Sequence, residues 1–175
     1  RYGNPSKPIL YPVIGPYGIP MTRHYPIKKG IAGEANDHHH HQSIHYNHPI
    51  SGVDFWHGRG GARIRNDEIV KAEKLGDQGL IVSRNSWVIG EKRICSDTTE
   101  ILCGLTKGGR FIDYKVSIHA TDQDITFEDS KEGAMSIRTH PALRLTGKVA
   151  KGSAINSEGV SGRDIWGKRA KWVDY

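Results

Sequence analysis

Seven of the ten histidines of this chain lie in one stretch or directly beside it, in residues 37–57. Imidazole is the side chain whose charge changes nearest to neutral pH, and in its neutral form it is the commonest protein ligand for borderline metals. Chemistry is therefore sought first in this histidine-rich stretch. Its histidines and carboxylates are Asp37, His38, His39, His40, His41, His45, His48, Asp54 and His57.

Two kinds of chemistry suit these residue types. His38, His40, His41 and Asp37 could transfer protons to and from a substrate, or bind it through polar contacts. The same three histidines could instead hold zinc, copper or iron with an open coordination position, with Asp37 as a further ligand or as the acceptor for an imidazole Nδ1–H. A solvated polar loop is the alternative to both. We expect an extended backbone here, in which His39, His41 and His45 point one way and His38 and His40 the other.

Aromatic residues follow the histidines. Phe55, Trp56 and His57 form a group that is common in carbohydrate clefts, where a flat ring stacks on the apolar face of a sugar and polar groups take its hydroxyls. A buried aromatic anchor is an equally good interpretation. Further along, Glu132, Arg138 and His140 share one face of an expected strand, and Glu132 and Arg138 could orient a hydroxylated or anionic ligand. The alternative for this face is an ordinary ion pair.

Composition limits the function classes. A chain of 175 residues suits one domain that buries roughly 70% of its unfolded surface. The net charge of +6 comes from scattered basic residues without interleaved stacking aromatics, so nucleic-acid binding is not expected. Two cysteines cannot build a disulfide framework or a zinc finger, and no stretch is long and apolar enough to span a membrane.

The pattern of apolar residues predicts β-strands throughout. Prolines exclude a helix from residues 1–30, which we expect to form an edge strand and a long loop. Strands are predicted at residues 63–75, 80–88, 98–105, 110–120, 122–127 and 132–140, the first two joined by a hairpin loop at residues 76–79. In the last strand, Met135 and Ile137 should face the core. No helical repeat persists, so the prediction is a single all-β domain, an antiparallel β-sandwich or supersandwich.

Five segments of the chain form a set of motifs: DHHHHQS (37–43), GVDFW (52–56), FEDSKEG (127–133) with Ile137 and Arg138, NSEG (156–159) and WGKRAKWVDY (166–175). Taken together, these motifs resemble those of the PmoA-like family of largely uncharacterised bacterial proteins, which carries the name of a methane oxygenase subunit. The similarity extends in order over nearly the whole chain. Within the first motif the chain departs at His39, where the family has proline, and at Gln42, where it has arginine.

The resemblance implies a fold similar to that of galactose mutarotases, in which histidines and a carboxylate act on a sugar ring at a concave sheet face. It also implies that the chain is a partial domain, incomplete at its C-terminal end, and that a membrane-bound oxygenase is the wrong interpretation of the family name. The leading hypothesis is a carbohydrate-binding or carbohydrate-processing protein. The alternatives are a metal-dependent oxidase or hydrolase and a non-catalytic assembly module that forms homo-oligomers. We expect no membrane span, and a periplasmic or secreted location in bacteria fits this expectation.

Overall fold

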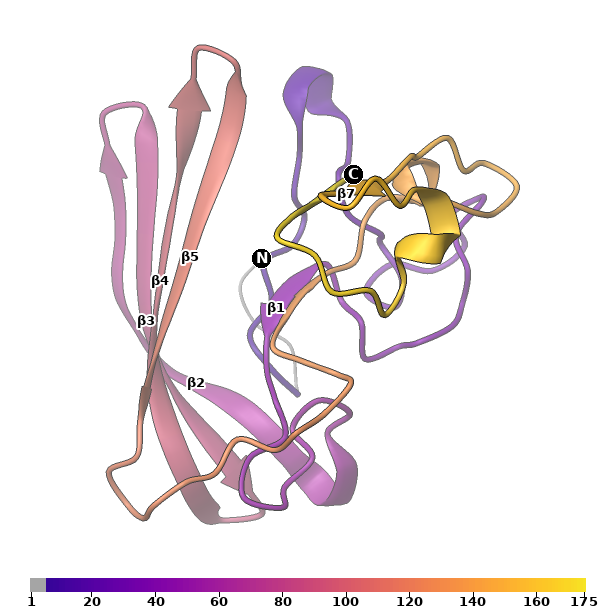
Figure 1. The fold of residues 1–175 in the computed structure, drawn as a ribbon. Coiled ribbons are helices and arrows are strands. Elements are labelled where there is room, and N and C mark those ends of the chain that lie inside the picture. Colours follow the sequence, from indigo (N-terminus) through magenta and orange to yellow (C-terminus); the bar gives the residue numbers. More distant parts are fainter. Residues whose placement is uncertain (1–5) are drawn as a thin grey trace.

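The computed structural model describes residues 6–175, and its largest element is one long, strongly twisted antiparallel sheet (Figure 1). The strands follow one another in the sheet in the order β2-β3-β4-β5, as in a meander. The all-antiparallel pairing and the absence of α-helices from the described residues confirm the all-β class that the sequence predicted. The strands are β2 (Ala62–Leu75), β3 (Gln78–Ile89), β4 (Lys92–Thr106) and β5 (Gly109–His119).

Tight two-residue turns join the four strands, at residues 76–77, 90–91 and 107–108. Gly76 and Gly90 open the first two turns with φ of 62° and 56°. Positive φ is what short hairpin turns need to match the twist of the strands, and glycine adopts it without steric cost. The hairpin predicted at residues 76–79 is therefore present, with a shorter loop and longer strands than expected.

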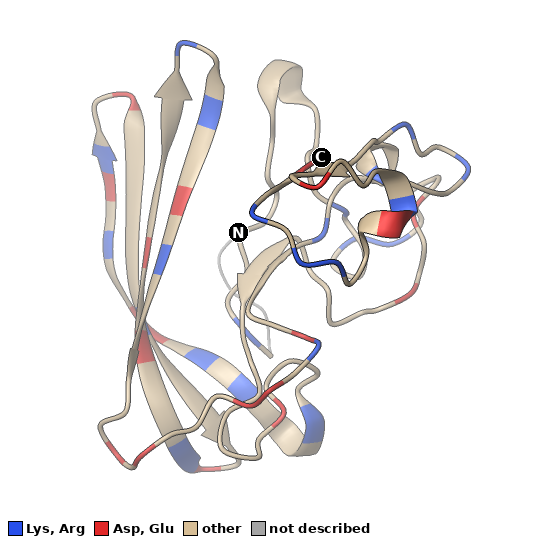
Figure 2. Ribbon diagram, viewed as in Figure 1, with Lys and Arg blue, Asp and Glu red and all other residues tan. Residues whose placement is uncertain are grey.

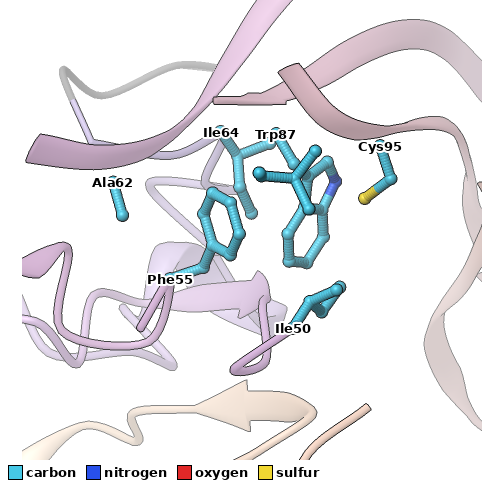
Figure 3. Close-up of a cluster of buried hydrophobic side chains, with 7 residues drawn as sticks. Ile50, Phe55, Ala62, Ile64, Trp87 and Cys95 are labelled. Atoms are coloured by element: carbon cyan, nitrogen blue, oxygen red, sulfur yellow. The ribbon is translucent and has the colours of Figure 1, made fainter. Parts of the chain in front are cut away.

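The main core packs against one end of the sheet, which is formed by the start of β2, the end of β3 and the start of β4 (Figure 3). Trp87 of β3 packs edge to face on Phe55, with ring centroids 5.0 Å apart, and both side chains are buried. An aromatic pair of this geometry adds about 1 kcal/mol to the burial of its area. The remaining buried members of the cluster are Ile50, Ala62, Ile64, Ile94 and Cys95.

A row of buried polar side chains crosses the inner face of the sheet above this core. Asn85 lies opposite Asp97, two residues along β3 from the pairing of Trp87 with Cys95. Ser83 lies opposite Thr99, four residues along β3 from the same pairing. Asp97 accepts hydrogen bonds from Asn85 Nδ2, Thr99 Oγ1 and Trp87 Nε1, each at 2.7 Å. We call this row, Ser83, Asn85, Asp97 and Thr99, the polar belt.

Beyond the polar belt the inner face becomes apolar again and lines an open groove of about 690 Å³. Ile81, Ile101 and Ile112 form its sheet wall. Its opposite wall comes from the N-terminal segment and from the two-stranded pair of β1 (Ile44–Tyr46) with β6 (Met135–Ile137). Figure 1 shows the long sheet and this second layer on opposite sides of the molecule.

The second layer is mostly irregular. Its regular elements are the β1–β6 pair, a second short pair of β7 (Ile155–Asn156) with β8 (Val173–Asp174), and four 3-10 turns. A complete second sheet is not formed by residues 6–175, so the similarity to a mutarotase supersandwich stays a prediction. The 3-10 turns are η1 (Pro16–Gly18), η2 (Arg59–Gly61), η3 (Pro141–Leu143) and η4 (Gly162–Ile165).

Three of the predicted strands are wrong in extent. Residues 122–127 form no strand, and only Phe127 makes an isolated bridge, to Ile50. The strand predicted at 132–140 shrinks to β6, where Met135 and Ile137 are 43% and 58% exposed and face the groove instead of the core. The N-terminal edge strand reduces to a bridge between Leu10 and Ile44, and residues 1–5 lie outside the described part of the chain.

Within the described residues, no helix combines the length and apolar character that a membrane-spanning segment requires.

Candidate functional site

The histidine run forms a turn instead of the predicted extended segment. His38 has a positive φ of 44°, and the His41 N–H donates to the His38 carbonyl at 2.9 Å. Histidine is one of the residues that adopt this left-handed conformation more readily than most. Because the chain turns, the rings do not alternate between two faces as expected. We call residues 38–41 the histidine turn.

The rings of the histidine turn pack against one another and against His57. The centroid of His40 lies 4.3 Å from that of His41, edge to face, and 4.5 Å from that of His57. His38 stacks on His41 at 5.2 Å. His38 and His39 are exposed, whereas His40, His41 and His57 are half-buried. The structure thus brings together histidines from two separate segments, residues 38–41 and His57.

A buried arginine that the sequence analysis did not select holds the histidine turn in place. The Arg23 guanidinium donates to the carbonyl oxygens of Ala35, Asp37, His38 and His41 at 3.0 to 3.2 Å, and to Asp37 Oδ1 at 2.7 Å. A planar guanidinium presents five donors in a fixed fork, so it can satisfy several converging acceptors at once. Arg23 is therefore the anchor that gives the turn its shape.

Asp37 lies between positive charges. Besides Arg23, Arg138 Nη2 donates to its Oδ1 at 3.1 Å, and His38 Nδ1 lies 3.2 Å from its Oδ2. Partial burial alone would raise the pKa of this carboxyl, but the hydrogen bonds from Arg23 and His38 and the charge of Arg138 lower it to about 2. Asp37 is consequently ionised and bonded to its positively charged neighbours, which suits a positioning role better than proton transfer.

The two central imidazoles are held in their neutral form. Burial, together with the neighbouring His57 and Lys7, lowers the pKa of His40 to about 4. Burial and the nearby His40 and Arg138 lower the pKa of His41 to about 3. Desolvation disfavours the imidazolium, and every neighbouring positive charge adds to this. At neutral pH each ring therefore offers one hydrogen-bond donor and one acceptor.

Three buried ring nitrogens without a hydrogen-bond partner lie beneath the histidine turn. They are His41 Nε2, His45 Nε2 and Trp56 Nε1, and the rings of His41 and His45 both contact Trp56 with centroids 5.5 Å apart. His41 Nε2 lies 3.8 Å from Glu132 Oε2, beyond hydrogen-bond distance. His45 is fully buried and its Nδ1 is paired with the Gln42 carbonyl at 3.0 Å. Three unpaired ring nitrogens therefore lie at the floor of the site.

Lys7 is a second residue that sequence reasoning missed. Its buried Nζ donates to the carbonyl oxygens of His40 at 2.7 Å and Trp56 at 3.5 Å, which ties the histidine turn to the segment that carries His57. Burial lowers the pKa of this amine to about 7. A lysine in this state exchanges its proton near neutral pH.

This lowered pKa predicts a pH dependence of stability. Between pH 7 and the ordinary lysine pKa of 10.5 the unfolded chain binds more protons at Lys7 than the folded chain. Stability contributed by this residue should therefore rise with pH across that window, by up to ~1.4 kcal/mol per pH unit. Lys7→Met lacks the titrating group. The free energy of unfolding of the wild type minus that of the variant, both measured with urea, should therefore increase as pH rises. Parallel pH profiles of the two proteins would contradict the lowered pKa.

The other predicted site residues divide into two groups. Glu132 and Arg138 reach the site, beside His41 and Asp37 respectively, although they do not pair with each other. His57 reaches it too, with Nδ1 2.9 Å from Asp54 Oδ2. His140 does not, because its Nδ1 accepts from the Ala142 N–H and caps η3.

The predicted stacking aromatics are wrong as a ligand platform. Phe55 is 2% exposed and belongs to the core cluster, and Trp56 is 4% exposed beneath His41 and His45. Neither ring presents a face to solvent, so the alternative interpretation, a buried aromatic anchor, describes both. The exposed tryptophans are Trp166 and Trp172, near the C-terminus.

No group of three or more histidine, cysteine, aspartate or glutamate side chains among residues 6–175 has the arrangement of a metal site. The rings of His38, His40 and His41 contact one another instead of converging their nitrogens on one point. As it stands, the site is better suited to polar contacts with a ligand than to coordination.

Fold and site together define an all-β protein with a polar, histidine-lined site at the edge of its second layer. The model of a family of unknown function, DUF6807, matches residues 2–175, and the chain belongs to this family. Neither the curated proteins nor the solved structures contain a significant match.

Proposed function

We propose that the protein binds a carbohydrate at the histidine turn, where His40 and His41 contact the sugar hydroxyls. The observation that supports this is the pair of half-buried, neutral imidazoles held edge to face at 4.3 Å, with Glu132, His57 and Asp37 around them. A hydroxyl both donates and accepts a hydrogen bond, and so does a neutral imidazole. The site therefore matches a ligand that presents several hydroxyls.

The same groups could move a proton. A neutral imidazole can accept a proton from a hydroxyl that it contacts and return this proton to another oxygen of the sugar, so that the ring ends in the neutral form in which it began. His41 Nε2 is a ring nitrogen without a hydrogen-bond partner and with a carboxylate, Glu132, 3.8 Å away. Sugar processing would use His40 and His41 in this way, while Asp37 and Arg138 fix the geometry around them.

The buried position of Trp56 shapes the proposal. Without an open aromatic face, binding depends on hydrogen bonds and desolvation, and each such bond contributes about 1 kcal/mol. We therefore expect moderate affinity and strong dependence on the pattern of hydroxyls.

A thermal-shift screen with neutral and acidic monosaccharides and oligosaccharides, followed by calorimetry, tests the proposal. We expect at least one sugar to stabilise the wild type, and His40→Ala to weaken its binding at least tenfold, or ~1.4 kcal/mol. His119→Ala is the matched control, because His119 is an exposed histidine of β5 that bonds Thr98.

The screen also includes Zn²⁺, Cu²⁺ and Fe²⁺, since neutral imidazoles are good ligands for these ions. If metal-stripped protein is stabilised by a metal and by no sugar, and His41→Ala removes that effect, the carbohydrate proposal is wrong. Absence of any response to sugars would count against it equally.

A further inference from the structure

The two edges of the long sheet differ in a way that bears on assembly. At one edge, β2 carries two register irregularities, between Asn66 and Glu68 and between Ile69 and Lys71. Most of its side chains are charged or polar, and the Ile64 N–H near its start donates to the Ser6 carbonyl. Bulges and charges of this kind keep an edge from pairing with another strand.

The opposite edge, β5, has no such irregularity and carries fewer charges. All eleven of its residues pair with β4 in an unbroken register, from Gly109 with Thr106 to His119 with Ser96. Within residues 6–175 no other strand pairs with it. Arg110, at its start, donates to the Ile14 carbonyl through its side chain. The outer backbone groups of a regular strand at a sheet edge are a template for a further strand.

The residues of β5 are complementary to themselves. Side chains of one sign and the other alternate with apolar ones along this edge (Figure 2). In an antiparallel pair of two β5 strands centred on Tyr114, Asp113 faces Lys115 of the partner subunit, and the symmetry repeats this contact. Asp113 forms no ion pair within the described chain, whereas Lys115 Nζ bonds Glu100 Oε1 at 2.8 Å. A partner would thus complete a chain of alternating charges across three strands.

Pairing of two β5 strands centred on Tyr114 would also extend the apolar sheet wall of the groove into the partner subunit. Ile112, Tyr114 and Val116 face the inner side of the sheet, and the first two line the groove. Across the two-fold axis Ile112 would lie opposite Val116 of the partner subunit. Cross-strand pairs of opposite charge and of β-branched residues both stabilise antiparallel strands. Centring the pair on Asp113 or Lys115 instead would place like charges directly opposite each other.

We propose that β5 is a homodimerisation edge, at which a second copy of this chain adds its own β5 antiparallel and centred on Tyr114. The two four-stranded sheets then form one continuous sheet. This inference is independent of the proposed carbohydrate site, because β5 contributes no residue to the histidine turn.

Sedimentation of the whole chain over a concentration series, with mass determination, tests the proposal. We expect the wild type to reach twice the mass of the chain. Asp113→Lys alone places lysine opposite lysine, and Lys115→Asp alone places aspartate opposite aspartate, so each variant should remain monomeric. An equimolar mixture of the two variants restores opposite charges at both contacts and should return to the dimer mass.

Glu68→Lys on the β2 edge is the control, because it changes the net charge as Asp113→Lys does and should leave the dimer unchanged. Circular dichroism establishes that each variant is folded. A wild type that stays monomeric at every concentration overturns the proposal. So does an Asp113→Lys protein that remains dimeric, or a mixture of the two charge variants that fails to associate.

Discussion

Arg23→Met is expected to destabilise the fold by about 3 kcal/mol and to abolish ligand binding at the histidine turn. The substitution leaves the carbonyls of Ala35, His38 and His41 without their shared donor, and an unsatisfied buried acceptor costs about 1–3 kcal/mol. It also removes the closest positive charge from Asp37. The turn that holds His40 against His41 should then lose its fixed shape.

Urea unfolding measures the loss of stability, and calorimetry with the best sugar from the screen measures the loss of binding. Arg23→Lys should fall between the wild type and the methionine variant, because an ammonium keeps the charge but cannot reach four acceptors in a planar fork. Arg84→Met is the control, since Arg84 is an exposed arginine that pairs with Glu68 on the sheet. An Arg23→Met protein with wild-type stability and binding would refute the anchoring role.

Asp97→Ala is expected to cost about 3–5 kcal/mol, because it leaves several buried donors without their acceptor and each such donor costs about 1–3 kcal/mol. The substitution leaves the donors of Trp87, Asn85 and Thr99 without their acceptor, and all three residues are buried. Burial raises the pKa of this carboxyl, so its charge is itself costly, and the three hydrogen bonds offset that cost.

Asp97→Asn separates the cost of the buried charge from the contribution of the hydrogen bonds. An amide keeps an oxygen acceptor for Trp87 Nε1 and carries no charge, so we expect this variant to lose much less stability than Asp97→Ala. Thermal and urea unfolding of both variants measures the difference. Equal losses in the two variants would show that the charge, and not the hydrogen bonds, decides the contribution of Asp97.

The long sheet was predictable from the sequence because its strands pair with their neighbours in the chain. Residues 110–120 alternate apolar and polar side chains, and Gly76 marks a hairpin, so local pattern and local turn chemistry agree. The irregular second layer lacked such a signal. Residues 122–127 contain enough apolar side chains for a strand, yet their neighbours in space offer only one bridge, from Phe127 to Ile50.

The sequence analysis selected most of the side chains that line the site, but it missed the two buried residues that hold them in place. The density of histidines pointed to residues 38–41 and His57, and Glu132 and Arg138 were selected because they share one face of a predicted strand. Arg23 and Lys7 stand in the proline-punctuated N-terminal segment with no pattern around them, and their roles arise from contacts more than thirty residues away for Lys7 and 12 to 18 residues away for Arg23. Trp56 was misassigned because exposure of an aromatic residue cannot be read from spacing.

The polar belt divides the inner face of the long sheet into two separate apolar compartments, the Trp87 cluster below it and the groove above it. Opening of one compartment does not require exposure of the other, since hydrogen-bonded side chains and not packed methyl groups lie between them. None of the residues that line the groove belongs to the Trp87 cluster, so a substitution in the groove wall is expected to leave the packing of that cluster unchanged. A row of four hydrogen-bonded side chains thus separates one meander into two ends that pack independently.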